Sequence, residues 1–243
     1  MSRLHKPKAG FWIRTWVVLI YPVIGLVFRI RWRHLDRVPP PEAGGVIIAV
    51  NHISQVDTLL MARLVWQAGR VPRFMIKSGV FGWPVIGPMM RGAGQISVSR
   101  GTADAAQSLH DAVEAIGRGE AVVIYPEGTT TKDPDSWPMQ GKTGIGRLVL
   151  LTPDTPVVPV GQWGAHRTGR RSLRRFARRR TASGAVGEPL DFSRYRDVAP
   201  GQRVQRQITD EIMTAIRAEV AELRGEPAPE KFFVPNRKYV DKL

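Results

Sequence analysis

Residues 46–57 read VIIAVNHISQVD, an apolar run followed at once by a polar cluster. The unbroken β-branched residues of this run, 46–50, favour a strand that is buried on both faces, as in a parallel sheet. Residues 58–66 then have the pattern of a helix. Because ligands of open α/β sheets bind beyond the carboxyl ends of the strands, residues 51–57 lie where a functional site is expected.

The alternation of strand and helix continues along the chain. Further strands are predicted at 74–77, 95–100, 121–125 and 157–160, and further helices at 102–116 and 144–151. The Gly- and Pro-rich stretch 79–94 is expected to be a loop. A C-terminal helix that ends at Gly225 is indicated by an apolar residue at every fourth position, namely Val204, Ile208, Ile212, Ile216 and Val220. The predicted fold class is α/β, with a mixed, mostly parallel sheet flanked by helices.

Length and composition exclude several classes of protein. The 243 residues suffice for an α/β domain with a sizeable core, and an apolar content of 43% excludes wholesale disorder. The chain has no cysteine, which excludes a disulfide scaffold, a cysteine nucleophile and thiolate metal sites. The formal net charge is +15, so an anionic partner is expected.

Two segments carry the excess positive charge. Residues 1–37 contain eight Lys or Arg and one acid, and residues 163–180 contain eight Arg and no acid. An anionic membrane or a nucleic acid would suit such patches, and a solvated arginine-rich surface is the alternative. A non-enzymatic basic adaptor is therefore the competing class of function. Because the sequence shows no recognition-helix pattern and no aromatic-interleaved RNA-binding pattern, we expect no nucleic-acid partner.

The N-terminal segment favours the membrane. Residues 15–28 read TWVVLIYPVIGLVF, a run without charge that is shorter than the roughly 20 residues of a spanning helix. Nearby aromatic residues and flanking arginines suit a helix at the membrane interface, although a helical hairpin packed on its own domain is the alternative. The Pro-rich linker at 38–45 indicates a boundary between an N-terminal helical membrane-docking segment, 1–38, and an α/β domain, 39–243.

His52 and Asp57 are the first candidates for catalysis. At a strand-to-helix turn the loop can fold back, so that the carboxylate fixes the imidazole tautomer and stabilises the imidazolium. In a chain without cysteine and without a Gly-x-Ser-x-Gly elbow, such a pair implies general-base activation of a substrate hydroxyl. The alternative is a His and an Asp that merely cap the start of a helix.

Two further clusters follow predicted strands. Arg100 is a natural bidentate ligand for phosphate, or else a partner in a surface salt bridge. The turn Pro126-Glu127-Gly128-Thr129 offers backbone N–H groups and a hydroxyl to an anion, and Glu127 is expected to orient the turn or a basic neighbour. Lys142 in GKTG does not complete a phosphate-binding loop, because the first glycine of that pattern is missing, so a nucleotide hydrolase is disfavoured.

Together these clusters resemble the motifs of the glycerolipid acyltransferases. The four motifs occur in that family's order and approximate spacing: Asn51-His52-x4-Asp57, GQISVSR at 94–100, YPEGT at 125–129 and VVPV at 157–160. The resemblance runs from about residue 40 to 190, and it is to the bacterial 1-acyl-glycerol-3-phosphate acyltransferases of the PlsC type. The N-terminal segment also resembles the membrane-docking hairpin of that family.

The resemblance implies a role for each motif. His52 is the base, Asp57 orients it, and Arg100 helps to hold the phosphate of the acceptor. Glu127, Gly128 and Thr129 match the family's substrate-binding turn, and residues 157–160 match a motif associated with the acyl donor. The family pattern continues with an arginine where this chain has Thr130, and Lys77 or Lys142 is expected to compensate.

The implied activity is transfer of a fatty acyl group from acyl-CoA or acyl-carrier protein to a hydroxyl of lysophosphatidate, in phospholipid biosynthesis and without a cofactor or metal. Glycerol-3-phosphate, another lysophospholipid or a glycolipid are alternative acceptors. Backbone amides at the start of the helix after His52 are expected to stabilise the oxyanion. We expect association with the cytoplasmic face of a membrane, where residues 163–180 meet either the phosphates of the donor or the anionic lipid.

Overall fold

The computed structural model describes residues 10–99, 102–165 and 180–235. Its strands are β1 (Phe28–Arg33), β2 (Val46–Val50), β3 (Pro72–Lys77), β4 (Ile96–Val98), β5 (Ala121–Ile124), β6 (Val157–Trp163) and β7 (Arg180–Val186). Its α-helices are α1 (Phe11–Val27), α2 (Asp57–Gln67), α3 (Ile86–Gly92), α4 (Thr102–Gly117), α5 (Gly144–Leu151) and α6 (Gln202–Arg224). A short 3₁₀ helix, η3 (Ser78–Gly82), precedes α3.

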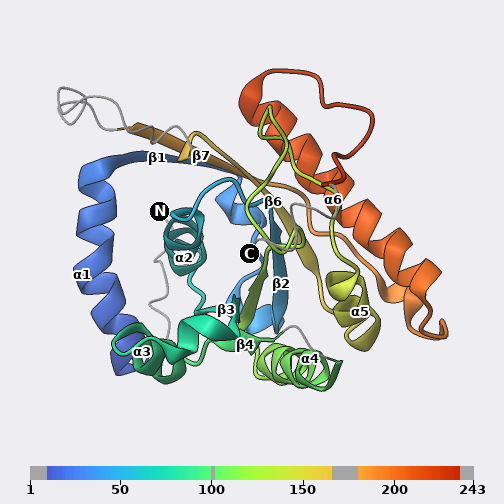
Figure 1. Ribbon diagram of the computed structural model, residues 1–243, viewed down its shortest axis with the longest axis horizontal. Coiled ribbons are helices and arrows are strands. Elements are labelled where there is room, and N and C mark those ends of the chain that lie inside the picture. The colour runs from blue at the N-terminus through green and yellow to red at the C-terminus, as the bar shows by residue number, and fades with distance from the viewer. Residues whose placement is uncertain (1–9, 100–101, 166–179, 236–243) are drawn as a thin grey trace.

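The seven strands form one sheet in the order β1-β7-β6-β2-β5-β3-β4 (Figure 1). Strands β6, β2, β5, β3 and β4 are mutually parallel, whereas β7 is antiparallel to β6 and parallel to β1. The edge pair β1 and β7 therefore runs against the other strands. This arrangement confirms the predicted mixed, mostly parallel sheet. The carboxyl ends of β2, β5 and β6, which are neighbours in the sheet, meet at one edge.

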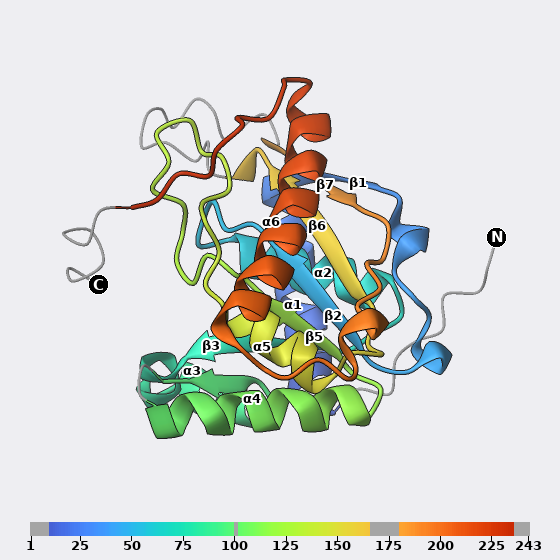
Figure 2. The ribbon, with the colours of Figure 1, turned by 90° about the vertical axis from the view of Figure 1, so that its right-hand side faces the viewer.

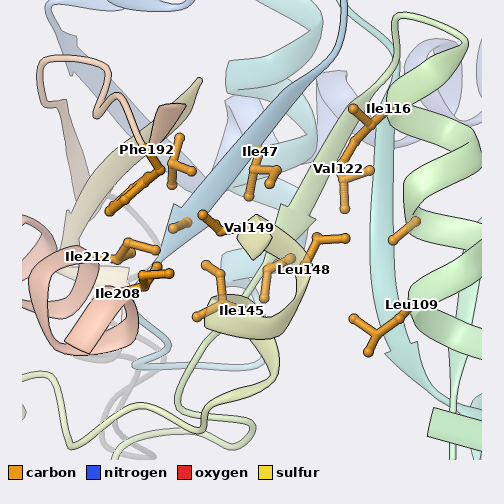
Figure 3. Packing of buried hydrophobic residues seen from close by; sticks show 14 of the residues in the cluster. Ile47, Leu109, Ile116, Val122, Ile145, Leu148, Val149, Phe192, Ile208 and Ile212 are labelled. Carbon is orange, nitrogen blue, oxygen red and sulfur yellow. The ribbon is translucent and has the colours of Figure 1, made fainter. Parts of the chain in front are cut away.

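Helices cover both faces of the sheet because alternate residues of the buried strands point to opposite sides. On one face lie α4, α5 and α6 (Figure 2), and Ile47 and Val122 pack against them (Figure 3). On the other face, Ile48 and Val123 pack against α2. Each fully buried side chain of this kind contributes roughly 1.5–3 kcal/mol. The central strand β2, which leads to His52, is thus fixed from both sides.

Helix α1 lies outside α2 and beside the edge of the sheet (Figure 1). Ile24, just before the end of the helix, and Phe28 pack against Leu60 of α2 and Ala182 of β7. The hydroxyl of Tyr21 donates a hydrogen bond of 2.7 Å to the carbonyl of Ala62. The opposite side of α1 is exposed and apolar, with Phe11, Val18, Leu19, Val23 and Leu26 between 54% and 74% exposed. Within the described ranges, no helix is long and apolar enough to cross a membrane.

Three elements differ from the sequence-based expectations. Strand β1 joins the sheet although it falls within the predicted segment 1–38, so that segment supplies a strand to the α/β domain as well as a helix. Strand β7 was not predicted, because RTASGAV has few large apolar residues. The expected loop at 79–94 contains η3 and α3. The glycine at position 92 allows the ring of Trp12 to pack closely against α3.

Candidate functional site

His52 and Asp57 form a pair at the carboxyl end of β2, as the sequence predicted. Nδ1 of His52 lies 3.0 Å from Oδ2 of Asp57. The Asp57 side chain is fully buried, whereas 16% of the His52 side chain is exposed. The imidazole therefore has a shielded carboxylate behind one nitrogen and can reach a substrate with its other nitrogen, Nε2. This is the geometry of a general base held by a carboxylate.

Asp57 also fixes the loop that carries His52. Its Oδ2 accepts hydrogen bonds from the backbone N–H groups of Ile53 at 2.6 Å and Ser54 at 2.7 Å, and its Oδ1 accepts one from the Ser54 hydroxyl. These donors precede α2, so Asp57 does not cap the helix with its side chain, which argues against the capping alternative. The same contacts engage the amides of residues 53 and 54. The expected oxyanion donors are the amides at the start of α2, which follow these two, and that role stays a prediction.

Glu127 holds the backbone of His52 from the neighbouring strand end. Its side chain is buried, its Oε1 accepts a hydrogen bond of 2.8 Å from the N–H of His52, and its Oε2 accepts one of 2.9 Å from the N–H of Met139. The N–H of Thr131 in the same turn donates to the carbonyl of His52 at 2.7 Å. Both backbone polar groups of His52 are thus held by the turn that follows β5. These contacts to backbone agree with the orienting role expected for Glu127, and its part in substrate binding stays a prediction.

Two more groups position His52, and sequence reasoning gave neither a role. The Tyr125 ring lies against the imidazole, with the ring centroids 4.4 Å apart. Asn51 and Gln162, both buried, join the ends of β2 and β6 through three hydrogen bonds between side chains and backbone, of 2.7 to 3.2 Å. Asn51 is the first residue of the predicted motif, but nothing in the sequence indicated its partner Gln162, which lies more than a hundred residues further along the chain.

Burial changes the acidity of two groups in this site. Desolvation raises the pKa of Glu127 from 4.5 to about 8, although the N–H bonds from Met139 and His52 act in the opposite direction. Desolvation also raises the pKa of the Tyr125 phenol well above its usual value, with a further contribution from Asp57. The Tyr125 hydroxyl is therefore neutral at physiological pH.

A cavity of about 460 Å³ is lined in part by Tyr125, Pro126 and Gly128, at the end of β5. Its lining includes three cationic residues, Lys77, Lys142 and Arg147, and no acidic residue. Gly128, whose φ is +68°, allows the Lys142 side chain to cross the turn, because a β-carbon at this position would lie only 2.8 Å from Nζ. Lys77 and Lys142, the two residues expected to compensate for Thr130, thus line the same cavity.

The remaining predicted site residues are placed as follows. Thr129 lies partly exposed in the turn that contains Gly128. Residues 157–160 are the first four of β6 and are buried in the middle of the sheet, where they contribute packing, and their association with the acyl donor stays a prediction. Arg100 lies outside the described residues, as does most of the basic segment 163–180. Within the part of the chain that the structure describes, no group of three or more His, Asp or Glu is placed to hold a metal ion.

The sheet thus presents a His–Asp pair at its strand ends with a buried glutamate behind the histidine, an arrangement that suits general-base catalysis. The sequence model of the acyltransferase family matches residues 29–163. The match covers more than half of the chain and includes all the residues just described at the ends of β2, β5 and β6. The chain therefore belongs to the acyltransferase family.

Several known proteins are similar to this chain. The 1-acyl-sn-glycerol-3-phosphate acyltransferase of Neisseria gonorrhoeae is 30% identical over 40% of this chain and 36% of its own length. The lyso-ornithine lipid O-acyltransferase of Rhizobium meliloti is 27% identical over 92% of this chain and 82% of its own length. The matched region thus spans about a third of the first of these relatives and most of the second.

A solved structure has the same fold. The crystal structure of the 1-acyl-sn-glycerophosphate (LPA) acyltransferase PlsC from Thermotoga maritima superimposes with a TM-score of 0.63 over 89% of this chain and 81% of that protein. The two sequences are 17% identical, so the likeness concerns the fold.

Proposed function

We propose that this protein transfers a fatty acyl group from an acyl thioester, acyl-CoA or acyl-carrier protein, to the free hydroxyl of lysophosphatidate. The observation that carries the proposal is the His52–Asp57 pair, held by Glu127 at the ends of adjacent parallel strands. The relatives named as 1-acyl-sn-glycerol-3-phosphate acyltransferases support the same acceptor.

The reaction uses His52 first as a base and then as an acid. Nε2 of His52 takes the proton of the acceptor hydroxyl, and the oxygen attacks the thioester carbonyl. An ester C–O bond forms, the C–S bond breaks, and the departing thiolate receives the proton from the imidazolium. Asp57 stabilises the positive charge on the imidazolium between these steps. The cationic cavity holds the anionic head group of the acceptor close to the base.

The apolar parts of both substrates require a route from the membrane. The outward face of α1 is apolar along its length and suits an interfacial helix. A small apolar cavity of about 90 Å³ lies between α1, α2, β3 and α3, behind the loop of the His–Asp pair. We infer that the protein binds the cytoplasmic face of a membrane peripherally, with α1 in the interface.

A second acceptor is favoured by one observation. The relative that matches 92% of this chain is named as a lyso-ornithine lipid O-acyltransferase. Ornithine carries an amine, so its lipid is less negative than lysophosphatidate. This chain has Thr130 where the family pattern has an arginine, and the loss of that positive charge suits a less anionic head group. The acylation chemistry at His52 is the same for both acceptors.

The test is acyl transfer by purified protein to a panel of acceptors. Lysophosphatidate, lyso-ornithine lipid and glycerol-3-phosphate are each offered with acyl-CoA, and the product ester is measured. We expect turnover with lysophosphatidate, and a fall of about 10²–10⁴-fold in His52→Ala, because general-base catalysis contributes that much. Near-normal turnover in a folded His52→Ala variant would exclude the mechanism. Preference for lyso-ornithine lipid would select the second acceptor.

A further inference from the structure

The turn between η3 and α3 carries two exposed apolar side chains, in addition to those on the outward side of α1. Trp83 is 56% exposed and Val85 is 71% exposed, and they are separated only by Pro84. Large apolar side chains gathered at the surface mark interaction sites more often than isolated ones do. The contacts that hold the His52 site do not involve either side chain, so the pair requires another explanation.

The turn is closed by its own backbone. The N–H of Trp83 donates to the carbonyl of Val80, and the N–H of Gly87 donates to the carbonyl of Trp83 at 2.9 Å. Nη1 of Arg91 donates to the carbonyl of Phe81 at 2.7 Å. A β-carbon at position 87 would lie 2.1 Å from that same carbonyl oxygen, so the tight return of the chain requires Gly87. A turn ordered in advance pays little entropy when it binds a partner.

Helix α3, which follows this turn, packs against the N-terminal end of α1. The Trp12 ring covers Gly92 at the end of α3, where a β-carbon would lie 2.2 Å from Cδ1 of Trp12. Figure 1 shows α3 beside the N-terminal end of α1. In that first turn of α1, Phe11 is 74% exposed and Trp12 is 36% exposed. The two helices also share the lining of the small apolar cavity, through Ile13 and Val17 on one side and Met90 and Ala93 on the other.

The charge of the segments that contain α1 and the η3–α3 turn indicates which kind of partner they bind. The sequence contains no Asp or Glu from residue 1 to 35 or from residue 58 to 103, although it contains seven and six Lys or Arg there. Arg14 on α1 and Arg91 on α3 are both exposed. A surface that combines exposed aromatic and aliphatic side chains with cations, and lacks acids, fits the headgroup region of an anionic bilayer.

We propose that the η3–α3 turn is a second bilayer anchor, in which Trp83 and Val85 insert into an anionic membrane when α1 docks on it. The inference rests on the membrane binding proposed above for α1. A single helix lying in the interface leaves the domain free to rotate about the helix axis. A second contact at the turn fixes that rotation, and with it the direction in which the His52 site faces the lipid.

The absence of cysteine in the chain permits a direct test. Three single-cysteine variants, Val85→Cys, Leu19→Cys and Val198→Cys, are labelled with a fluorophore that brightens and shifts to the blue in an apolar medium. Val198 is exposed and lies before α6, away from α1. On vesicles that contain phosphatidylglycerol, we expect the probes at 85 and 19 to respond and the probe at 198 to stay unchanged. A response at 19 alone would overturn the second anchor and leave docking through α1 intact. No response at either site would overturn both.

A functional variant tests the same proposal independently. Trp83→Ser with Val85→Ser should weaken vesicle affinity roughly ten-fold or more, because two inserted apolar side chains are lost. Acylation of membrane-embedded acceptor should fall with it, whereas acylation of a short-chain soluble acceptor should be kept and should report an intact fold. Val198→Ser is the matched control and should leave both unchanged. Undiminished vesicle affinity in the double variant would overturn the proposal, and it is the outcome expected if this pair binds a protein instead of lipid.

Discussion

Glu127 was expected to orient its turn, but the sequence did not show which groups it holds. The motif predicted a turn after a strand, and His52 with Asp57 was predicted from spacing at a strand end. The role of Glu127 arises from contacts with His52 and Met139 in two other loops, and from its burial. Neither burial nor long-range contact is visible in a local pattern. Asn51 and Gln162 escaped prediction for the same reason.

The pKa of Glu127 predicts a dependence of stability on pH. Because burial raises this pKa to about 8, the folded chain keeps a proton between pH 4.5 and 8 that the unfolded chain has released. Stability from this group therefore falls as pH rises through that window, by at most ~1.4 kcal/mol per pH unit. Glu127→Gln cannot titrate, and it places an NH₂ group against a backbone N–H, so it should be less stable than wild type at pH 5.

We expect the free energies of unfolding of Glu127→Gln and wild type to converge as pH rises from 5 to 8. Urea unfolding at several pH values, followed by circular dichroism, measures the difference and cancels the titration of other groups. A constant difference across this range would show that Glu127 has the same protonation state in the folded and the unfolded chain, so that its pKa is not raised by folding. The variant should also lose turnover with little change in acceptor KM, since it loosens His52 and leaves the cavity intact.

Lys142 should contribute to acceptor binding. It crosses the turn at Gly128 and lines the cationic cavity. Lys142→Gln removes a charge-assisted contact to phosphate worth roughly 1.5–3 kcal/mol, so the acceptor KM should rise about ten-fold or more. The KM for acyl-CoA should change less. The matched control is Lys231→Gln, an exposed lysine outside the cavity, and equal effects of the two substitutions would place the head group elsewhere.

At the level of elements, the interior of the sheet was predictable and its edges were not. Strand β2 has an unbroken β-branched run because both its faces are buried, and this makes it conspicuous. In the edge strand β1, FRIRWR, apolar residues alternate strictly with arginines. Because these arginines follow the apolar run of α1, the sequence pattern indicates a basic flank of that helix instead of a strand. Helix α3 contains two glycines and a proline, and it forms where α1 packs on it rather than from local propensity.

Because β1 is part of the sheet, deleting the N-terminal segment is a poor test of whether α1 docks on a membrane. Deleting residues 1–37 would remove a strand that pairs with β7, so loss of activity would not separate docking from folding. Leu19→Glu with Val23→Glu instead alters two outward side chains that are 60% and 54% exposed. This variant should fold, keep activity on a short-chain soluble acceptor, and bind vesicles more weakly, with a matching fall in activity on embedded acceptor. Sedimentation with vesicles and circular dichroism measure these outcomes. Full retention of vesicle binding would show that α1 is only a packed helix.

On the scale of the whole molecule, the excess positive charge and the exposed apolar side chains both suit the partner proposed above, an anionic membrane. Outside the segments 1–37 and 163–180, positive and negative residues balance, so the net charge of +15 belongs to those two stretches. Apolar insertion and attraction to anionic lipid respond differently to salt, because ions screen charges and leave apolar transfer nearly unchanged. The Debye length falls from about 10 Å at 0.1 M salt to about 3 Å at 1 M.

Binding to anionic vesicles should therefore weaken as salt is raised and level off at a residual affinity. That residual should equal the affinity for neutral phosphatidylcholine vesicles, which only the apolar side chains of α1 and the η3–α3 turn supply. Adding Leu19→Glu and Val23→Glu should lower the residual binding at high salt to the share that the η3–α3 turn supplies, and leave part of the binding to anionic vesicles at low salt. Sedimentation of each protein with both kinds of vesicle, from 0.05 to 1 M salt, measures all three quantities. Equal binding to neutral and anionic vesicles at low salt would mean that the basic segments face away from the bilayer, and the second of them, 163–180, would then be left to bind the phosphates of the acyl donor.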